Sequence, residues 1–334
     1  MSEVYNPDGR ILVVGSLAYD HVMRHAGSFK DAILPGNYNV SLPAAGRQVF
    51  FGGCGGNIAY SLSLFGERPV IITAAGKDFD DYEKRLSSLG VDISFVTRSR
   101  HLPTASAFIV TDKNENQVTI FDPGAMHGED CAVSIGDVLS AKRDASQDAE
   151  RGGVSRAIIS PDKPSNMLKF ARECREHGIP YIFDPAQQIG LFEDDELLTA
   201  ISGAEILIVN EYEAGLLESK LGLVRAKIAT MAGIYIETHG ARGAAVQVNL
   251  AGRACEMLHI AAVAPTRLID PTGCGDAFRA GVLVGLQRGF GIEKACRVGA
   301  LLATYSLECA GTQSHSFTLA RFADRFKESF GESF

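Results

Sequence analysis

The sequence predicts an α/β fold: a mostly parallel sheet with helices packed on it, and a small β-sheet that forms a lid. Two observations predict this fold. Short apolar runs without polar alternation recur along the chain, and helical periodicity follows them. Two further segments interrupt this pattern and lack helical periodicity. Strands that alternate with helices form βαβ units, which give parallel sheets with right-handed crossovers.

The expected strands and helices of the parallel sheet follow one another in order. The first strand is "ILVVGS", which is rich in β-branched residues, and the later strands are "PVIITAAG", "SRAIIS", "PYIFDPA", "AEILIVN" and "GIYIETHG". The helices are "NIAYSLSLFG", "NMLKFARECREHG", "EDDELLTAISG" and "EYEAGLLESKLG". Parallel strands end at one edge of a sheet, where ligands bind. We therefore expect Asp184, Asn210 and Thr238 to lie along that edge.

The two interrupting segments predict the lid. Residues 18–48 contain glycine, proline and short apolar pieces, whereas "SAFIVT" and "QVTIF" flank the polar turn "DKNEN" and predict a hairpin. A small sheet inserted between βαβ units has its natural place over the ligand edge. We therefore predict an α/β core of residues 1–17, 49–103 and 124–334, and a lid of residues 18–48 and 104–123.

Composition limits the function classes and the location. The net charge of −8 over 334 residues argues against a nucleic-acid partner, but a few backbone N–H groups suffice to bind phosphate. The seven cysteines are scattered, with no CxxC pair, which favours reduced thiols. The N-terminus is polar, so we expect no signal peptide. The sequence contains no uninterrupted apolar run of about 18 residues, so we expect neither a membrane span nor a membrane partner. We expect a cytoplasmic protein.

The stretch "DPTGCGDAFRAG" joins a glycine-rich turn to an apolar helix. The first turn of that helix has free N–H groups, and Thr272, Gly273, Cys274 and Gly275 add little side-chain bulk, which suits an anion hole. Asp276 would point at the same place and accept a proton from a hydroxyl group that attacks phosphate. The alternative is an aspartate that only caps a buried helix.

A second glycine-rich turn, "FGGCGG", opens the helix that begins near Asn57. It could be a packing turn or a dinucleotide turn. However, the turn does not match GxGxxG, and no part of the chain matches GxxxxGK[ST]. If a phosphate donor binds, neither a Walker loop nor a dinucleotide fingerprint holds it.

Together these motifs resemble the ribokinase-like (PfkB-type) carbohydrate and nucleoside kinases over nearly the whole chain. The order is "GSLAYD", "GGCGGNIAYSLSLFG", "TASAFIVTD", "VNEYEA", "THGARGAAV" and "DPTGCGDAF". The resemblance implies a three-layer α/β sandwich around the sheet and a kinase that uses ATP and Mg²⁺. The pieces "FDPGAM", "DPAQQ" and "AGTQSHSF" look most like the bacterial adenosine kinases.

The resemblance assigns roles to the last motif. Asp276 becomes the catalytic base, and the backbone amides of Gly273, Cys274 and Gly275 form the anion hole. The family usually has alanine where Cys274 stands, but only the backbone is used there. At the other glycine motif, Asp20, Gly53 and Asn57 would bind sugar hydroxyl groups. Without the resemblance, Asp20 is simply a turn residue at a strand end.

The predicted lid supplies candidates for binding a nucleoside base. Phe108 and Phe121 lie in the predicted lid hairpin, and this placement suits stacking on the base. Gln187 and Gln188 of "DPAQQ" would hydrogen-bond its edge. The alternative for the two phenylalanines is a place in the core.

Two further motifs match the family's nucleotide and metal sites. Asn210 and Glu213 would organise magnesium, largely through water, although a helix cap with acids in its first turn gives the same pattern. Thr238, Gly240 and Gly243 would lie along the nucleotide, and a simple turn between strands is the alternative.

Asp270 and Thr272 stand where many relatives bind a monovalent cation. The remaining ligands would be carbonyl groups of residues 309–312, and that loop differs from the ribokinase pattern, so K⁺ dependence stays open.

The sequence thus predicts an enzyme that transfers phosphate from ATP to the 5′-hydroxyl of a ribonucleoside. Adenosine is the first choice, with AMP as product in purine salvage. A ribokinase or another PfkB-type sugar kinase is the same-class alternative, and a homodimer formed through the lid is one expected assembly. A non-catalytic ligand-binding member of the fold and a Rossmann dehydrogenase are the alternatives from other classes.

Overall fold

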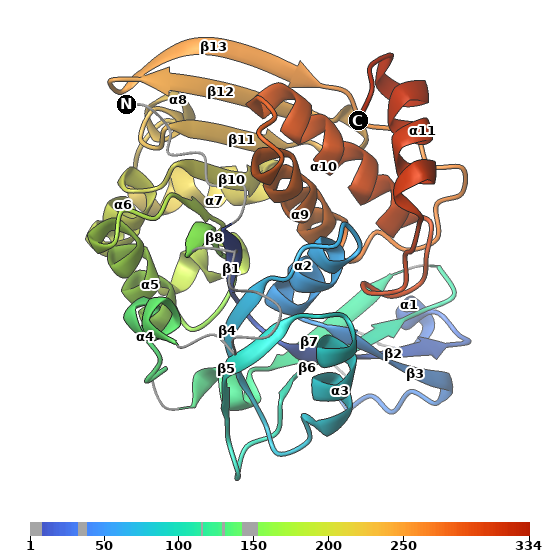
Figure 1. Cartoon of the computed structure of the whole chain (residues 1–334). Helices are drawn as coiled ribbons and strands as arrows, with labels where there is room; N and C mark the ends of the chain where they lie inside the picture. Colours follow the sequence, from blue (N-terminus) through green and yellow to red (C-terminus); the bar gives the residue numbers. More distant parts are fainter. Residues whose placement is uncertain (1–8, 33–38, 115, 129–130, 142–152) are drawn as a thin grey trace.

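The computed structural model describes residues 9–32, 39–114, 116–128, 131–141 and 153–334 (Figure 1). Predictions for residues 1–8 and 33–38, including the N-terminal start of the core and the middle of the first lid segment, lie outside the described residues. Within the described part of the chain, no helix combines the length and apolarity that crossing a membrane requires.

A large sheet forms the centre of the molecule. In the described residues its strands pair in the order β13-β12-β11-β10-β9-β8-β1-β4-β5, and all neighbours are parallel except at β12 and β13. The strands are β1 (Arg10–Val14), β4 (Val70–Ala75), β5 (Asp92–Arg98), β8 (Val154–Ile159), β9 (Tyr181–Phe183), β10 (Ile206–Asn210), β11 (Ile234–Thr238), β12 (Ala244–Leu250) and β13 (Arg253–Ile260). The predicted strands are confirmed.

Helices cover both faces of this sheet, which explains why its inner strands are apolar without alternation (Figure 1). One face carries α2 (Cys54–Ser63), α3 (Asp80–Ser88), α9 (Cys274–Gln287), α10 (Ile292–Leu307) and α11 (Leu319–Phe330). The other carries α4 (Ile135–Ser140), α5 (Pro164–Glu176), α6 (Asp194–Ser202), α7 (Glu211–Leu221) and α8 (Arg225–Ala229). Successive residues of β1 point to opposite faces, so Ile11 and Val13 join one core while Leu12 and Val14 join the other.

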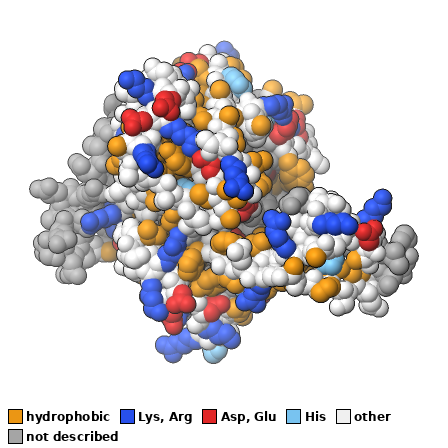
Figure 2. Space-filling model, turned by 90° about the vertical axis from the view of Figure 1, so that its right-hand side faces the viewer, with side chains coloured by type: hydrophobic (Ala, Val, Ile, Leu, Met, Phe, Trp, Pro, Cys, Tyr) orange, Lys and Arg blue, Asp and Glu red, His pale blue; other side chains and the backbone are white. Residues whose placement is uncertain are grey.

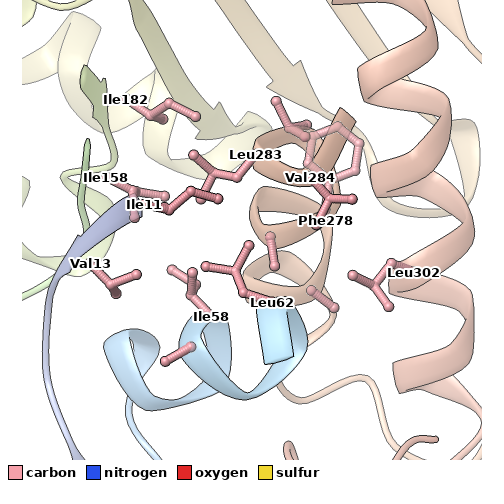
Figure 3. Close-up of a cluster of buried hydrophobic side chains, with 14 of the residues drawn as sticks. Ile11, Val13, Ile58, Leu62, Ile158, Ile182, Phe278, Leu283, Val284 and Leu302 are labelled. Carbon is pink, nitrogen blue, oxygen red and sulfur yellow. The ribbon is translucent and has the colours of Figure 1, made fainter. Parts of the chain in front are cut away.

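The first core holds α2 and α9 against the middle of the sheet. Figure 3 shows this cluster, in which side chains of α2 and α9 meet those of three strands: Ile58, Leu62, Phe278, Leu283, Val284, Ile11, Val13, Ile158 and Ile182. Both helices begin at the glycine-rich turns that the sequence singled out. The core therefore fixes the positions of these two turns.

The backbones of α9 and α10 lie unusually close together. A Cβ atom added to Gly281 would lie 2.5 Å from the Cα atom of Gly299, and one added to Gly285 would lie 2.5 Å from the Cα atom of Ala295. Real Cβ atoms do not approach backbone that closely, so even alanine at these positions would force the helices apart.

A smaller sheet, which we call the lid, has the strand order β3-β2-β6-β7 among the described residues. It consists of β2 (Ala18–His25), β3 (Ala44–Gly52), β6 (Ala105–Thr111) and β7 (Gln117–Asp122), with the short helix α1 (Phe29–Ala32) following β2. β2 is parallel to β6, and the outer pairs are antiparallel, so the predicted hairpin is confirmed. β3 runs past residue 48 to Gly52, because its pairing with β2 continues to Ala18.

Asp112 connects the lid hairpin to α1. Its carboxylate accepts hydrogen bonds from the backbone N–H groups of Phe29 (2.9 Å), Asn114 (2.8 Å) and Asn116 (2.9 Å). Burial alone would raise the pKa of Asp112, but these hydrogen bonds and the side chain of Asn116 lower it to about 2. One carboxylate thus holds two separate lid segments together.

The surface carries mixed charge. On the face shown in Figure 2, lysine and arginine side chains lie among aspartate, glutamate and hydrophobic side chains. All seven cysteines are free thiols.

Candidate active site

The turn before α9 is closed by a glycine that the fold requires. Gly273 is the N-cap of α9 and has a left-handed backbone conformation (φ 77°), and a Cβ atom there would lie 2.8 Å from the Thr312 side chain. The first turn of a helix leaves N–H groups without partners inside the helix, at the positive end of its dipole. Cys274 and Gly275 lie in this turn, and the Cys274 N–H makes only a long contact of 3.4 Å, to the Pro271 carbonyl oxygen. The predicted anion-hole amides therefore sit at a helix start.

Asp276 lies in the same turn and points at the other glycine-rich helix. It is 9% exposed, and its Oδ2 accepts a hydrogen bond of 2.8 Å from Asn57 Nδ2, 219 residues away in the chain. Burial raises the pKa of Asp276, while Arg279 and the side chains of Asn57 and Cys54 act to lower it. The structure therefore brings together two predicted residues, a carboxylate and the amide that donates to it.

Arg279 is a buried countercharge, one helical turn after Asp276. Its Nη2 donates to Asp184 Oδ1 (2.6 Å), and the same nitrogen lies 3.9 Å from Glu213 Oε2. Burial raises the pKa of Asp184 to about 7 against the opposing charge of Arg279. This arginine links the edge residue Asp184 to the predicted metal ligand Glu213 beneath the site.

Asp20 reaches the site from the lid strand β2. A Cβ atom on Gly52 would lie 2.3 Å from Asp20 Oδ2, so this carboxylate lies directly over the turn that precedes α2, where Gly53 is the N-cap. Burial, together with the nearby charges of Asp276 and Asp270, raises the pKa of Asp20 to about 7. The carboxylates of Asp20, Asp270 and Asp276 thus lie near one another at the start of α9.

Asp270 ties the turn before α9 to the segment after α10. Its Oδ1 accepts a hydrogen bond from the Thr272 N–H (2.9 Å), and its Oδ2 accepts one from the Gly311 N–H (3.0 Å). Both carboxylate oxygens are therefore used for holding backbone. These contacts explain a structural role for Asp270 and do not by themselves build a cation site.

Asn210 and Glu213 form a reciprocal cap at the start of α7. Asn210 Oδ1 accepts from the Glu213 N–H, and Glu213 Oε2 accepts from the Asn210 N–H, both at 2.8 Å. This is the capping alternative described above, and it uses Oε2 of the carboxylate. The described residues contain no group of three or more His, Cys, Asp or Glu side chains that could hold a metal ion directly. A magnesium ion held through water, by the second oxygen of Glu213, fits this arrangement.

Thr238 ends β11 beside Asn210, its register partner at the end of β10. Asp184 directly follows β9, which pairs with β10, so the three predicted edge residues lie at the ends of successive strands. Gly240 and Gly243 form the turn between β11 and β12, where His239 N–H donates to the Gly243 carbonyl oxygen (2.7 Å). The turn and the edge are therefore contiguous.

The two lid phenylalanines lie on opposite faces of the lid. Phe121 is in register with Ala107, and Ala107 with Asp20, so Phe121 shares the face of Asp20. Phe108 is in register with His21 and stacks on its ring, with 4.8 Å between the ring centroids. Only Phe121 (46% exposed) therefore lies on the face that carries Asp20, and the expectation that both rings serve one base is corrected.

Gln187 and Gln188 lie in the short 3₁₀ helix η2 (Ala186–Leu191), which packs against α7. Gln187 is exposed, whereas Gln188 is 6% exposed and its Oε1 has no hydrogen-bond partner in the described structure. A buried amide oxygen without a partner favours a bound donor group. The structure thus places both glutamines beside the helix that carries Glu213.

Sequence reasoning missed a second set of buried and half-buried polar residues around Asp276: Cys54, Tyr82, Arg85, Arg279 and Gln313. One signal was available. Arg279 is the one basic residue in the otherwise apolar helix that follows Asp276, and a buried arginine needs an acidic partner. For Gln313 and Arg85 no local pattern exists, because their partners lie more than 200 residues away.

Comparison with known proteins gives a consistent assignment. The model of the pfkB family of carbohydrate kinases matches residues 9–318. A nucleoside kinase of Methanothermobacter thermautotrophicus is 27% identical over 97% of both chains, and a ribokinase of Bacillus subtilis is 25% identical over 80% of this chain and 84% of its own.

Solved structures agree with this assignment. The structure of Burkholderia thailandensis nucleoside kinase in complex with inosine is 34% identical, has a TM-score of 0.82, and covers 97% of this chain and 99% of its own. The three-layer fold with a small lid sheet is therefore confirmed, and a Rossmann dehydrogenase is excluded. The chain belongs to the pfkB family of carbohydrate kinases, phosphotransferases whose acceptor is an alcohol group.

Proposed function

We propose that this kinase transfers the γ-phosphoryl group of ATP to the 5′-hydroxyl of a ribonucleoside, with adenosine as the first choice. One observation carries the proposal: Asp276, at the start of α9, lies close enough to Asp20 of the lid for its charge to raise the pKa of Asp20. Relatives named nucleoside kinase and ribokinase, and a neighbouring structure with ADP and inosine bound, support a ribosyl acceptor and ATP as donor.

In the proposed reaction Asp276 accepts the proton of the 5′-hydroxyl as its oxygen bonds to the γ-phosphorus, and the bond from that phosphorus to ADP breaks. The N–H groups of Cys274 and Gly275 stabilise the charge on the phosphoryl group in transit. Asp20 accepts hydrogen bonds from the ribose hydroxyls, and Asn57 keeps the Asp276 carboxylate oriented. The closed lid excludes water.

Magnesium, when bound, neutralises charge on the phosphates. Asn210 and Glu213 would hold it through water at the start of α7, and Thr238, Gly240 and Gly243 would follow the nucleotide along the adjoining edge. A K⁺ ion would bind beside Asp270 and Thr272, because each carboxylate oxygen of Asp270 accepts one backbone N–H group and keeps a lone pair for a cation.

The choice of adenosine over free ribose as the substrate depends on Phe121. A nucleoside base offers a flat face to stack on this ring, and such stacking contributes about 1–3 kcal/mol. Gln188 has an unpartnered amide oxygen that could accept a hydrogen bond from an amino group. With adenosine as substrate the product is AMP, and the reaction is a purine salvage step.

Calorimetric titration of Phe121→Ala tests this assignment. We expect adenosine affinity to fall by roughly tenfold to a hundredfold, and ribose affinity to change far less. Phe108→Ala is the matched control, because Phe108 belongs to the same hairpin but faces the other way; adenosine affinity should stay within about threefold. Tight ribose binding without measurable adenosine binding in the wild type would leave a ribokinase. ADP release with adenosine, inosine and cytidine would rank the nucleosides.

We also propose that two copies associate through the outer face of the lid. This face, opposite to Asp20, carries four exposed apolar side chains: Val49 (45%), Phe108 (38%), Val118 (47%) and Ile120 (65%). An apolar patch on one face of a small sheet is typical of an interface between identical subunits.

A further inference from the structure

A directed chain of hydrogen bonds runs from helix α3 to Asp276. Arg85 Nε donates to Gln313 Oε1 (3.3 Å), and Arg85 Nη2 donates to the Gln313 carbonyl oxygen (2.6 Å). Gln313 Nε2 donates to Asn57 Oδ1 (3.1 Å), and Asn57 Nδ2 donates to Asp276 Oδ2 (2.8 Å). Gln313 is 4% exposed, and every bond of the chain joins residues more than 200 positions apart in the sequence.

The direction of this chain is fixed at its far end. Arginine has only donors, so the Gln313 atom facing Arg85 must be the oxygen. Tyr82 acts in the same sense: its hydroxyl donates to the Gly52 carbonyl oxygen (2.8 Å), so it accepts from Gln313 Nε2 (2.5 Å). Both N–H bonds of the Gln313 amide are therefore committed, one to Tyr82 and one to Asn57.

The guanidinium of Arg85 is itself held in place. It lies over the rings of Phe51 and Tyr60, 5.1 Å from each ring centroid. Next to Gln313, Thr312 donates to the Phe51 carbonyl oxygen (2.9 Å), and Gly311 donates to Asp270. The segment that carries Gln313 is thus attached both to the lid strand β3 and to the turn before α9.

The consequence appears at Asn57. An asparagine amide can turn end for end, and the two orientations differ in whether a donor or an acceptor faces Asp276. Because Gln313 presents an N–H group, Asn57 must offer its oxygen to Gln313 and its nitrogen to Asp276. The reversed orientation would place two oxygens against each other.

We infer that Gln313, oriented by Arg85, is a positioning residue for phosphoryl transfer: it fixes the amide of Asn57 so that Asp276 receives a hydrogen bond in its ionised form. The inference rests on the proposed role of Asp276 as the proton acceptor. It gives the "AGTQ" segment, residues 310–313, a function that does not depend on contact with the substrate.

Other groups also act on Asp276. Arg279 and Cys274 lie on its own helix, Cys54 lies on α2, and the acids that face it are Asp20 of β2, Asp184 after β9 and Glu213 of α7. None of them contacts Gln313 in the bonds described above. A change at Gln313 therefore reaches Asp276 through Asn57.

The test compares pH profiles of kcat and kcat/KM for the wild type, Gln313→Glu and Gln313→Met, with ATP and the nucleoside that turns over fastest. A glutamate at 313 only accepts, so Asn57 must turn its nitrogen away from Asp276. The acid limb of kcat should move to higher pH by about one unit, the effect of one hydrogen bond to a charged group. At neutral pH kcat should fall by roughly tenfold while KM changes less than threefold.

Methionine removes the chain without adding charge. Gln313→Met should shift the acid limb in the same direction by a smaller amount, which separates orientation from the charge of a glutamate. Gln287→Glu is the matched control: Gln287 is 6% exposed, lies on α9 with Asp276, and donates to the Gly9 carbonyl oxygen, away from the site. It should lower the melting temperature and leave the pH profile in place.

If both Gln313 variants melt like the wild type and neither moves the acid limb, the inference is wrong. If Gln313→Glu does not fold, Gln313→Met decides alone. Asp276→Asn separates the proposed function from the inference about Gln313. If Asp276→Asn is inactive and the pH profiles of the Gln313 variants do not move, only the positioning role of Gln313 is wrong. If Asp276→Asn is active, both the proposed role of Asp276 as proton acceptor and the positioning role of Gln313 are wrong.

Discussion

Asp276 is the residue on which the proposed chemistry depends. Asp276→Asn keeps the shape and the contact with α2 but cannot take up the hydroxyl proton. Turnover should fall by roughly a hundredfold or more. Adenosine and ATP should still bind with near wild-type affinity, measured by calorimetry. Turnover within a few-fold of the wild type would reduce Asp276 to a helix-capping residue.

Asp20 should make substrate binding depend on pH. Its pKa is raised to about 7 by burial and by the charges of Asp276 and Asp270. Only the ionised carboxylate accepts strongly from the ribose hydroxyls, so affinity should be full above pH 7 and should weaken as pH falls below it. Nucleoside dissociation constants measured from pH 5.5 to 8.5 should rise about tenfold for each unit below the pKa. Asp20→Asn should bind weakly with a flat pH dependence, and an equally steep curve in that variant would assign the titration to another group.

The contact between the lid hairpin and helix α1 depends on Asp112. Its pKa of about 2 lies below the ordinary value for aspartate, so ionised Asp112 stabilises the native lid above the unfolded pKa of about 4. This contribution is lost as pH falls from about 4 through 2. Asp112→Ala should mimic the acid form at neutral pH. Hydrogen exchange in residues 27–32 should become faster, because the Phe29 N–H loses its acceptor.

Residues 166–176 of α5 provide a comparison for that experiment. The hydrogen exchange of these residues should stay unchanged, because α5 packs on the face of the large sheet away from α2 and α9. Faster exchange in both regions would mean that the variant loosens the whole molecule, and the local role of Asp112 would be wrong.

Elements with local patterns could be predicted from the sequence. The strands of the parallel sheet have short apolar runs rich in β-branched residues, and the hairpin has a polar turn between two β-branched segments. Which lid side chains share a face could not be predicted without the strand register. Phe108 pairs with Ile120, so Phe121 lies on the other face of the lid. Contacts between distant segments, such as Gln313 with Asn57, leave no local signal, because only the assembled fold brings them together.

The outer face of the lid matters at the scale of the whole molecule. Ile120→Asp places a charge at the most exposed residue of the apolar patch, where an interface would have to bury it. Analytical ultracentrifugation should show a dimer for the wild type and a shift to monomer for the variant. Leu250→Asp is the matched control, because Leu250 is 73% exposed where β12 turns into β13, on the large sheet and not on the lid. A monomeric wild type would contradict the proposed association.

The close contact of α9 and α10 has a consequence for how this enzyme can evolve. Gly281 meets Gly299 backbone to backbone, and no side chain can be added there without moving α9, the helix that carries Asp276. Natural variation and laboratory selection for new acceptors should therefore leave this helix pair unchanged and gather in the lid, whose strands can change side chains without shifting the phosphoryl-transfer machinery. New specificities should arise by changes in the lid, while the helix pair α9 and α10 stays constant. Libraries aimed at other nucleosides are therefore best built in residues 105–122.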